Sequence, residues 1–425
     1  MHEYVEPLVK LTFVCDRGKC FEAEVFKESF RKFQERQNLA QEKQNSIVKP
    51  RVRVLFNGLH SKSGGGVTYL QNILPLMASD KEIDLHLGIH KEQRGLLPPN
   101  LENITIHTLE FPQGFWRLQI HEQIDIPRLA KSISADVTFS PANYGPLLVP
   151  NSIFLIRNAL SVAFVERRLL KLGYWALVYL GTFLSLLVSK KVIAVSEYAL
   201  KESTGGFLGL FKDRFIVVHH GVSKVFSPPQ KGVKRETFLL AVSDLYVQKN
   251  LKNLISAFRW IKVSNPDLRL KIAGRPIDKN YFQELKKIVA DYKLDEDIHF
   301  MGGVTSEELL KLYQTCGIFV FSSTVETFGN PLVEAMSCGA SIACSNTAAI
   351  PEVVGDAAEF FDPNNVESMA QAINRLLKDK GLRQSLSEKA LKRAKVFSWQ
   401  ITADKTLAVI KGVVVSKKNN LESNS

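Results

Sequence analysis

The sequence predicts an α/β protein with two doubly wound domains that face a common cleft. Two observations predict this class. Short apolar strands alternate with helical or loop segments along most of the chain, and the alternation runs twice, once on each side of a segment rich in proline and charge (residues 227–236, SPPQKGVKRE). Strands that alternate with helices form parallel sheets covered on both faces. A chain of 425 residues is long enough for two such domains.

The chain begins with a polar, charged extension, residues 1–49. Its apolar residues recur at roughly helical spacing: Phe21, Val25, Phe26, Phe30 and Phe33. This spacing predicts one amphipathic helix laid on the body of the protein.

The first domain is expected over residues 50–226. Its predicted strands are RVRVLFNG (51–58), IDLHLGIH (83–90), ADVTFSPA (135–142), SIFLIRN (152–158), KVIAVSE (191–197) and RFIVVHHG (214–221). A glycine-rich turn follows the first strand, and residues 64–77 (GGGVTYLQNILPLM) are predicted to form the next helix.

The second domain is expected over residues 227–396. Its predicted strands are TFLLAVS (237–243), LRLKIAG (268–274), IHFMGG (298–303), GIFVFSS (317–323), SIACS (341–345) and AEFFD (358–362). Residues 397–425 are expected to form a helix that returns toward the first domain, followed by a polar tail.

One apolar segment interrupts this alternation. Residues 169–188 (LLKLGYWALVYLGTFLSLLV) carry one charge in twenty and are flanked by basic pairs, Arg167-Arg168 and Lys190-Lys191. The length suits a membrane span, but two strands predicted for the same sheet flank the segment. A buried helix and a helix lying in a membrane interface, with its basic flanks near acidic headgroups, are the other two interpretations.

The composition indicates anionic partners and a reducing compartment. A formal charge of +12 suits phosphorylated small molecules or an acidic membrane surface. Nucleic acid is not expected, because the basic residues are spread along the chain without a recognised nucleic-acid motif. The five cysteines have no zinc-ligand spacing, and MHEYVEPLVK lacks a signal-peptide pattern. We therefore expect a cytoplasmic protein without disulfides.

Ligands of open parallel sheets gather beyond the carboxyl ends of the strands. This rule selects the glycine loop Gly64, Gly65 and Gly66, and the loops at 140–145, 157–158, 219–221, 243–250, 274–275, 302–303 and 323–330. All of them are expected to face the cleft.

The stretch SSTVETFGNPLVEAMSCGA (322–340) is the most informative of these loops. Asn330 suits an N-cap and Pro331 the first helical position, so free amides of this helix start should attract phosphate in the cleft. Glu326 and Glu334 lie on either side of that start. Their carboxylates would accept hydrogen bonds from hydroxyl groups, as on a sugar or ribose. A plain capping arrangement with solvated acids is the alternative.

Together these residues resemble a known family. Glu326 and Glu334, eight positions apart, are similar to the E-x7-E signature of the retaining group 1 glycosyltransferases, which have the GT-B fold of two Rossmann-like domains. The resemblance covers about residues 51–410. It also includes VIAVSEYA (192–199), VVHHGVSKVF (217–226), Lys249-Asn250, LKIAGR (270–275), IHFMGGVTSEELLKLY (298–313) and FSW (397–399).

The resemblance implies roles for individual residues. Glu326 would contact donor sugar hydroxyls, Glu334 the ribose, and Lys249 the diphosphate. Further donor contacts are implied for the loop from Gly64 to Gly66, for Gly302 near the base, and for the backbone of Phe328, Gly329, Asn330, Pro331, Leu332 and Val333.

Two departures from the family stand out. Asp244 and Gln248 occupy places where the family often has arginine, so additional positive charge would have to come from Arg275 or Arg157. IRN (156–158) replaces a histidine-containing turn, which leaves the catalytic base unassigned. Asn143, Arg157 and Asn158 are the candidate acceptor contacts.

The resemblance implies transfer of a sugar from a nucleotide diphosphate sugar to an acceptor hydroxyl, with no cofactor and no required metal. Asp295 to Asp297 (DED) mimics a metal-binding pattern but precedes its strand, at the wrong end of the sheet. The basic charge and residues 169–188 favour a saccharide or lipid-linked acceptor at the inner face of a membrane, in cell-surface polysaccharide or lipopolysaccharide synthesis. A nucleotide-sugar epimerase and a catalytically silent membrane-associated subunit are the alternatives.

Overall fold

The computed structural model describes residues 51–62, 64–99, 101–157, 169–203 and 206–422, together with Arg31. The helix predicted within residues 1–49 lies outside the described residues, except for Arg31. The candidate acceptor residue Asn158 also lies outside them.

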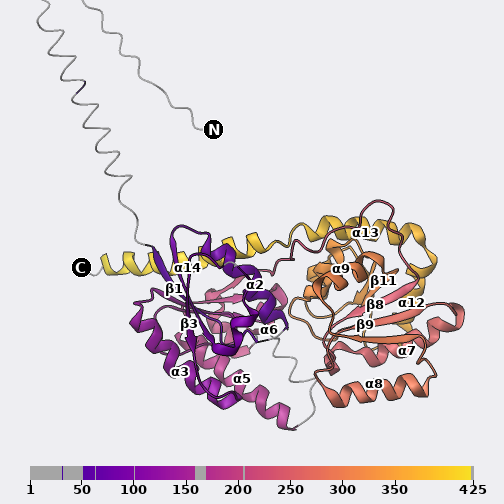
Figure 1. The fold of residues 1–425 in the computed structure, drawn as a ribbon, viewed down its shortest axis with the longest axis horizontal. Helices are drawn as coiled ribbons and strands as arrows, with labels where there is room; N and C mark the ends of the chain where they lie inside the picture. Colours follow the sequence, from indigo (N-terminus) through magenta and orange to yellow (C-terminus); the bar gives the residue numbers. More distant parts are fainter. Residues whose placement is uncertain are drawn as a thin grey trace, which may run out of the picture. The chain divides into compact units, whose positions relative to one another are not determined.

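The first sheet has seven parallel strands in the order β3-β2-β1-β4-β5-β6-β7 (Figure 1). They are β1 Val52–Asn57, β2 Ile83–His90, β3 Ile104–Leu109, β4 Val137–Ser140, β5 Ser152–Ile156, β6 Lys191–Ala194 and β7 Phe215–Val217. All six predicted strands are confirmed. The strand β3 was missed: it lies at the sheet edge, and most of its residues are only partly buried, so its apolar signal is weak.

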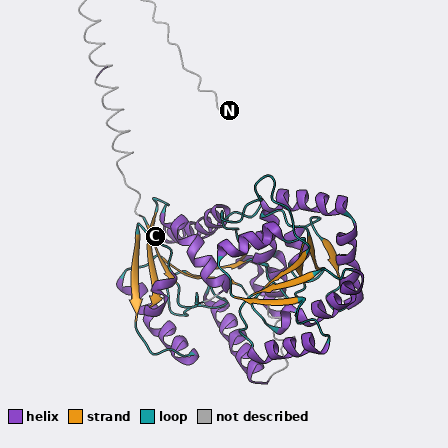
Figure 2. Ribbon diagram, turned by 45° about the vertical axis from the view of Figure 1, so that its right-hand side comes forward, coloured by secondary structure: helices purple, strands orange, loops and turns teal. Residues whose placement is uncertain are grey.

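The second sheet has six parallel strands in the order β10-β9-β8-β11-β12-β13. They are β8 Phe238–Val242, β9 Arg269–Ala273, β10 Ile298–Gly302, β11 Ile318–Phe321, β12 Ile342–Ser345 and β13 Glu359–Phe361. Each coincides with a predicted strand. Figure 2 shows the strands of this sheet with helices around them.

Helices cover both faces of the first sheet. Neighbouring residues of a strand point to opposite faces of the sheet. On β1, Phe56 packs on one face with α2 (Gly64–Ala78), and Leu55 packs on the other face with α3 (Phe115–Ser132). Helix α14 (Trp399–Glu422) joins α2, and α5 (Leu169–Val188) covers the end of the sheet near β5 and β6 on the face of α3. Both faces are buried, as expected for a parallel sheet.

The second sheet is covered in the same way. Residues of α7 (Leu251–Ser264), α8 (Lys279–Asp291) and α12 (Val366–Lys378) pack against Leu239 on one face. Residues of α9 (Ser306–Thr315), α10 (Asn330–Ser337), α11 (Ile350–Val354) and α13 (Lys380–Ala394) pack with Leu240 on the other. The remaining short elements are η1 Lys91–Leu96, α6 Glu197–Ser203, η2 Gly206–Arg214 and η3 Val247–Lys249.

The chain passes between the sheets twice. Residues 218–237 lead from β7 to β8, and α14 follows α13 back to the first sheet, where it packs on α2. At the crossing, any side chain at Gly221 would collide with the backbone of Trp399. Further along α14, the Lys411 ammonium binds the carboxylates of Asp80 (2.8 Å) and Glu82 (2.6 Å). The two sheets are therefore connected both by residues 218–237 and by the return of α14.

Helix α5 occupies the apolar segment 169–188. In the described part of the chain, no helix has the length and apolar character that crossing a bilayer requires. The flanking strands β5 and β6 pair directly, which excludes the membrane-span interpretation. One face of the helix buries Val178, Thr182 and Leu186, whereas Leu180 and Leu187 remain about half exposed. The helix is therefore partly exposed, with apolar residues on its exposed face, rather than fully buried.

Candidate functional site

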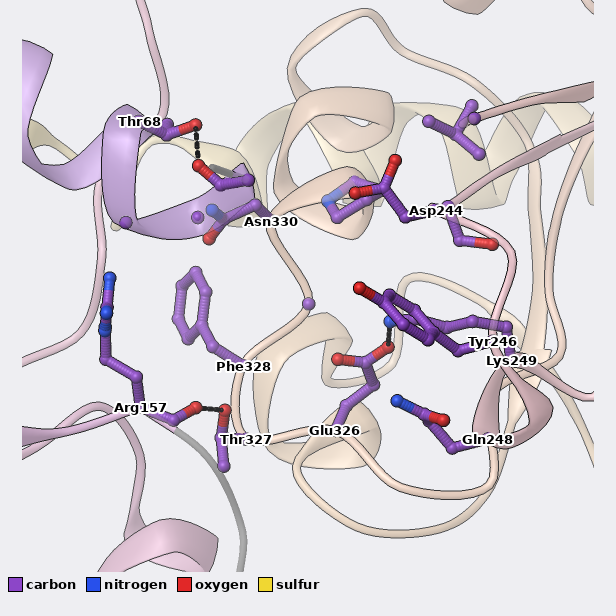
Figure 3. A pocket seen from close by; sticks show the side chains of 18 of the residues that line it. Thr68, Arg157, Asp244, Tyr246, Gln248, Lys249, Glu326, Thr327, Phe328 and Asn330 are labelled. Carbon is purple, nitrogen blue, oxygen red and sulfur yellow. Dashed lines mark hydrogen bonds and ion pairs between the residues drawn. The ribbon is translucent and has the colours of Figure 1, made fainter. Parts of the chain in front are cut away.

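A cavity of about 930 Å³ opens beyond the carboxyl ends of the central strands of both sheets. Its size suits a ligand as large as a nucleotide sugar. Thirteen predicted site residues line it: Gly64, Gly65, Gly66, Asn143, Arg157, Lys249, Arg275, Glu326, Phe328, Gly329, Asn330, Pro331 and Glu334. Part of this wall is drawn in Figure 3. The carboxyl-end rule therefore brought together residues that lie up to 270 positions apart.

Three predicted residues do not line the cavity. The side chains of Leu332 and Val333 are buried in the hydrophobic core, because they lie on the inner face of α10. Gly302 is bonded through its carbonyl oxygen to the amide of Gly274 (2.8 Å), and its neighbour Gly303 lines the cavity instead.

Lys249 and Glu326 meet directly in the cavity. The Lys249 ammonium donates to Oε1 of Glu326, and the two side chains are only 19% and 13% exposed (Figure 3). Two hydrogen bonds hold η3 against the loop after β11: the Ser322 hydroxyl donates to the Lys249 carbonyl (2.8 Å), and the Thr324 amide donates to the carbonyl of Gln248 (2.9 Å). The ion pair is therefore held from both of its loops.

The start of α10 differs from the prediction by one residue. Gly329, with φ of +88°, is the N-cap, and Asn330 is the first helical residue rather than the cap. A left-handed φ favours glycine, so Gly329 takes the position for which Asn330 was predicted. The Asn330 side chain instead places Oδ1 3.2 Å from Nδ1 of His220. Pro331 has no amide hydrogen and the Leu332 amide donates to the Gly329 carbonyl (2.9 Å), so this helix start offers an anion the amide of Asn330 and the positive end of the helix dipole.

Glu334 lies one turn into α10. Its Oε2 accepts a hydrogen bond from the Tyr313 hydroxyl (3.0 Å). Burial raises the pKa of Glu334 to about 7, against which the Tyr313 bond acts weakly. A carboxyl group with this pKa changes charge readily when hydroxyl groups of a ligand bind it.

Arg275 supplies positive charge from the loop after β9. Its guanidinium makes two contacts with the Asp244 carboxylate, at 3.0 and 3.3 Å, and its amide donates to the same group (3.1 Å). Asp244 takes a place where the family often has arginine, and it positions the Arg275 guanidinium at the cavity.

Arg157 supplies a second cation from the end of β5. Its amide donates to Oδ1 of Asn143 (2.9 Å), and its carbonyl accepts from the Thr327 hydroxyl. A side chain at Gly66 would collide with the Arg157 guanidinium, so this glycine allows the close approach. Burial lowers the pKa of Arg157 to about 10, and none of the described carboxylates forms an ion pair with it.

The glycines Gly64 to Gly66 form the first turn of α2, in agreement with the helix predicted over residues 64–77. Their position at a helix start, beside Arg157, still leaves backbone amides at the cavity. The first domain thus offers a second anion-attracting element opposite α10.

Sequence reasoning missed several residues of the first domain that line the cavity: His60, Thr68, Tyr144, Tyr174 and Val178. His60 follows β1 and Tyr144 follows β4, so the carboxyl-end rule pointed to their loops without selecting the side chains. Tyr174 and Val178 come from the apolar segment, whose contribution to the cavity had no signal in the sequence.

His219 and His220 shape the junction between the sheets. Nε2 of His219 lies 2.8 Å from Glu352, whose carboxylate also accepts from the amides of Glu197 and Tyr198. The His220 ring stacks on Trp399 (centroids 5.6 Å apart). Burial lowers the pKa of His220 to about 4, so this ring is neutral at physiological pH.

No group of three or more His, Cys, Asp and Glu side chains that could hold a metal ion occurs in the described ranges. Asp297 of the DED turn forms ion pairs with Lys262 (2.8 Å) and Arg269 (2.6 Å), at the amino end of β10. Independence from metal stays a prediction.

Comparison with known proteins supports the resemblance. Residues 224–393 match the family described as glycosyl transferases group 1. The serotype-specific mannosyltransferase WbdA of Escherichia coli is 28% identical over 192 residues, 45% of this chain and 24% of WbdA. The O-antigen chain mannosyltransferase B of Escherichia coli is 40% identical over 114 residues, 27% of this chain and 30% of that protein. The chain therefore spans less than a third of the length of these two relatives.

A third relative acts on a lipid-linked sugar according to its name. It is the N-acetylgalactosamine-N,N'-diacetylbacillosaminyl-diphospho-undecaprenol 4-alpha-N-acetylgalactosaminyltransferase of Campylobacter jejuni, 31% identical over 167 residues, 38% of this chain and 43% of that protein.

Solved structures share the whole fold. WaaG, a glycosyltransferase involved in lipopolysaccharide biosynthesis, superposes with a TM-score of 0.70 at 14% identity, over 84% of this chain and 100% of WaaG. Anabaena HepE in complex with UDP and glucose gives 0.67 at 16% identity, over 85% of this chain and 100% of HepE. The chain therefore has the GT-B fold of two parallel α/β sheets, and its residues 224–393 match the group 1 glycosyltransferases.

Proposed function

We propose that the protein is a retaining glycosyltransferase that moves a sugar from a nucleotide diphosphate sugar to an acceptor hydroxyl. The observation that carries this proposal is the Lys249–Glu326 ion pair beside the start of α10 in one cavity. Phosphate requires cations and amide donors, whereas sugar hydroxyls require acceptors such as carboxylates. The site supplies both kinds of group next to each other.

Donor binding exchanges the partners of this ion pair. The Lys249 ammonium moves from Glu326 to the diphosphate, and the released Glu326 carboxylate accepts hydrogen bonds from the donor sugar. As the glycosidic bond breaks, negative charge grows on the leaving diphosphate, and Lys249, Arg157, Arg275 and the start of α10 stabilise it. A preorganised set of this kind supplies the largest part of many enzymatic rate enhancements.

Glu334 is assigned to the ribose hydroxyls. Hydroxyl donors stabilise the ionised carboxylate, so ribose binding lowers the raised pKa of Glu334. Gly303, close to Arg275, borders the region assigned to the base.

Retention follows from attack on the face that the leaving group vacates. The acceptor oxygen bonds to the anomeric carbon, the bond from that carbon to the phosphate oxygen breaks with its electron pair, and the acceptor proton goes to a phosphate oxygen. No protein nucleophile and no metal ion take part in this scheme.

The acceptor is proposed to be a saccharide on a lipid carrier, in cell-surface polysaccharide synthesis. The names of the relatives support this class, since they include O-antigen chain synthesis and a diphospho-undecaprenol substrate. Mannose is the first sugar to test, because WbdA and the O-antigen chain mannosyltransferase B are named as mannosyltransferases.

Two apolar stripes support peripheral binding at the inner face of a membrane. On α3, Trp116, Ile120 and Ile124 are 63%, 55% and 41% exposed at intervals of four residues. Leu177, Leu180, Leu184 and Leu187 form the exposed stripe on α5. The rings of Phe115 and Tyr174 meet at 5.4 Å and join the two helices, which lie together along the lower edge of the first domain in Figure 1.

Basic residues accompany these stripes. Arg117 follows Trp116, and Lys190 follows the end of α5; both are exposed. A surface that binds a membrane peripherally usually places apolar side chains in the bilayer interface and cations near the anionic headgroups. We expect the double variant Leu180→Glu/Leu184→Glu to lose binding to vesicles of anionic phospholipid, and Val263→Glu, at an exposed apolar site on α7, to keep it.

Transfer assays with labelled nucleotide sugars and extracted membrane lipid test the activity, with EDTA present throughout. The proposal predicts a labelled lipid product from one donor, and its loss in Glu326→Gln. Turnover of the donor to an epimer without acceptor would favour an epimerase. Binding of a nucleotide sugar without any turnover would favour the silent subunit.

A further inference from the structure

We propose that His60, oriented by Glu122, binds the hydroxyl of the acceptor sugar. The inference rests on the proposed function and deepens it, because it assigns the acceptor side of the same cavity. His60 follows β1 and lines the cavity on the side of the first domain.

A buried carboxylate stands behind the His60 ring. Nε2 of His60 lies 2.9 Å from Oε2 of Glu122, a residue of α3 with 0% exposure. The other oxygen of Glu122 accepts a hydrogen bond from the side chain of Asn57 at the end of β1 (2.6 Å). Burying a carboxylate is costly unless donors satisfy it, so both contacts fix its orientation.

This contact selects the tautomer of His60. A carboxylate oxygen only accepts hydrogen bonds, so this contact favours the proton on Nε2, and in the neutral ring the free lone pair then lies on Nδ1. Within the described ranges, no residue makes a hydrogen bond to Nδ1. A lone pair on a ring in the cavity wall can accept the proton of a sugar hydroxyl.

Neighbouring rings hold His60 in place. The Tyr144 ring packs edge-on against it, with centroids 5.0 Å apart, and Gln119 donates to the Tyr144 hydroxyl (2.7 Å). Gly181 of α5 leaves room for Tyr144, since a Cβ there would already lie 3.3 Å from that ring. His60 is therefore fixed before the acceptor arrives, which lowers the entropic cost of binding.

The surroundings of His60 suit an acceptor rather than the donor. Tyr174 and Val178 of α5 line the same side of the cavity, and the exposed stripe of that helix begins at Leu177. The donor groups Lys249 and Glu326 come from the second domain. An acceptor carried on a membrane lipid would thus enter along α5 and meet His60 first.

Binding of short alkyl glycosides, hexyl α-mannoside and hexyl α-glucoside, tests the inference by calorimetry. The protein is first saturated with the nucleoside diphosphate that binds it. If no nucleoside diphosphate binds, that result counts against the proposed function itself, and not only against the role of His60. We expect His60→Gln to weaken glycoside binding about tenfold or more while nucleotide affinity is unchanged.

His121 offers a matched control. It pairs with Asp125 at 2.6 Å on the same helix as Glu122, but it does not line the cavity, so His121→Gln should bind the glycosides like the wild type. Equal binding by His60→Gln, or no glycoside binding by the nucleotide-bound wild type, would overturn the inference.

Nitrogen NMR of the His60 ring gives a second readout that does not depend on folding of a variant. We expect the Nε2–H tautomer in the free protein and a shift of the Nδ1 resonance on glycoside addition. An Nδ1–H tautomer would contradict the assignment.

Discussion

The two domains present their parts of the cavity in different ways. The second domain contributes a continuous motif, residues 326–334, in which two carboxylates, a left-handed glycine and a helix start lie within nine positions. The first domain contributes side chains from far apart, such as His60, Tyr144, Arg157 and Tyr174. Only the second domain lies within the matched family region, residues 224–393. A donor site built from backbone and one short motif can be recognised from sequence, whereas a site assembled from separate loops has no such signature.

The largest expected effect is at Lys249. If the second domain provides the main stabilisation of the leaving group, Lys249→Ala should reduce the transfer rate by about 10²- to 10³-fold. Lys252→Ala is the matched control, because Lys252 is exposed and pairs with Glu284 at 2.6 Å. Steady-state kinetics with saturating donor measure both variants. A Lys249→Ala enzyme that keeps more than a tenth of the rate would remove Lys249 from the mechanism.

A smaller effect is expected from the cation of the first domain. Arg157→Gln should weaken nucleoside diphosphate binding by about tenfold or more, because a hydrogen bond to a charged group contributes about 1.5–3 kcal/mol. Titration calorimetry compares it with Arg128→Gln, whose side chain is 77% exposed on α3. Unchanged affinity in Arg157→Gln would mean that the second domain binds the donor alone.

The smallest expected effect is a pH dependence from Glu334. Ribose binding favours the ionised form, so donor affinity should rise by up to about tenfold from pH 6 to pH 8, through the pKa near 7. A nucleotide sugar is the ligand of choice, and Glu334→Gln should show a flat profile. An identical rise in Glu334→Gln would assign the dependence to another group.

The same pKa predicts a stability effect without ligand. The pKa of Glu334 in the folded protein is raised above its ordinary value of 4.5. Between pH 4.5 and 7, Glu334 is therefore protonated in the folded protein and ionised in the unfolded chain. The free energy of unfolding should therefore fall as pH rises through this window, and Glu334→Gln should fall less. Urea unfolding at pH 5 and pH 7.5 measures the difference.

Much of the fold was predictable because buried parallel strands are short apolar runs, and every predicted strand is present. The strand β3 was missed because an edge strand needs only one apolar face. At the start of α10, the N-cap was assigned to Asn330 instead of Gly329, because asparagine is a frequent N-cap and the left-handed φ of Gly329 leaves no mark in the sequence. The backbone of Leu332 was predicted to line the donor site; its side chain is buried in the core, and the residue does not line the cavity.

The acceptor side was not predictable for a different reason. Glu122 lies on a helix whose sequence gives no sign that one carboxylate is buried, and its partner His60 is 62 positions away. Likewise, Asp244 looked like the loss of a cation until its contact with Arg275 was seen. Such pairs depend on the packing of the whole domain.

The central claim is that the cavity binds a nucleoside diphosphate through Lys249. The most direct test is the thermal stability of the wild type and of Lys249→Ala with UDP, GDP, ADP, dTDP and CMP, without added metal. A ligand at a hundred times its dissociation constant stabilises the folded protein by about 2.7 kcal/mol. We predict a rise in melting temperature with at least one nucleoside diphosphate, lost in Lys249→Ala. No rise with any nucleotide, or an equal rise in both proteins, would contradict the account.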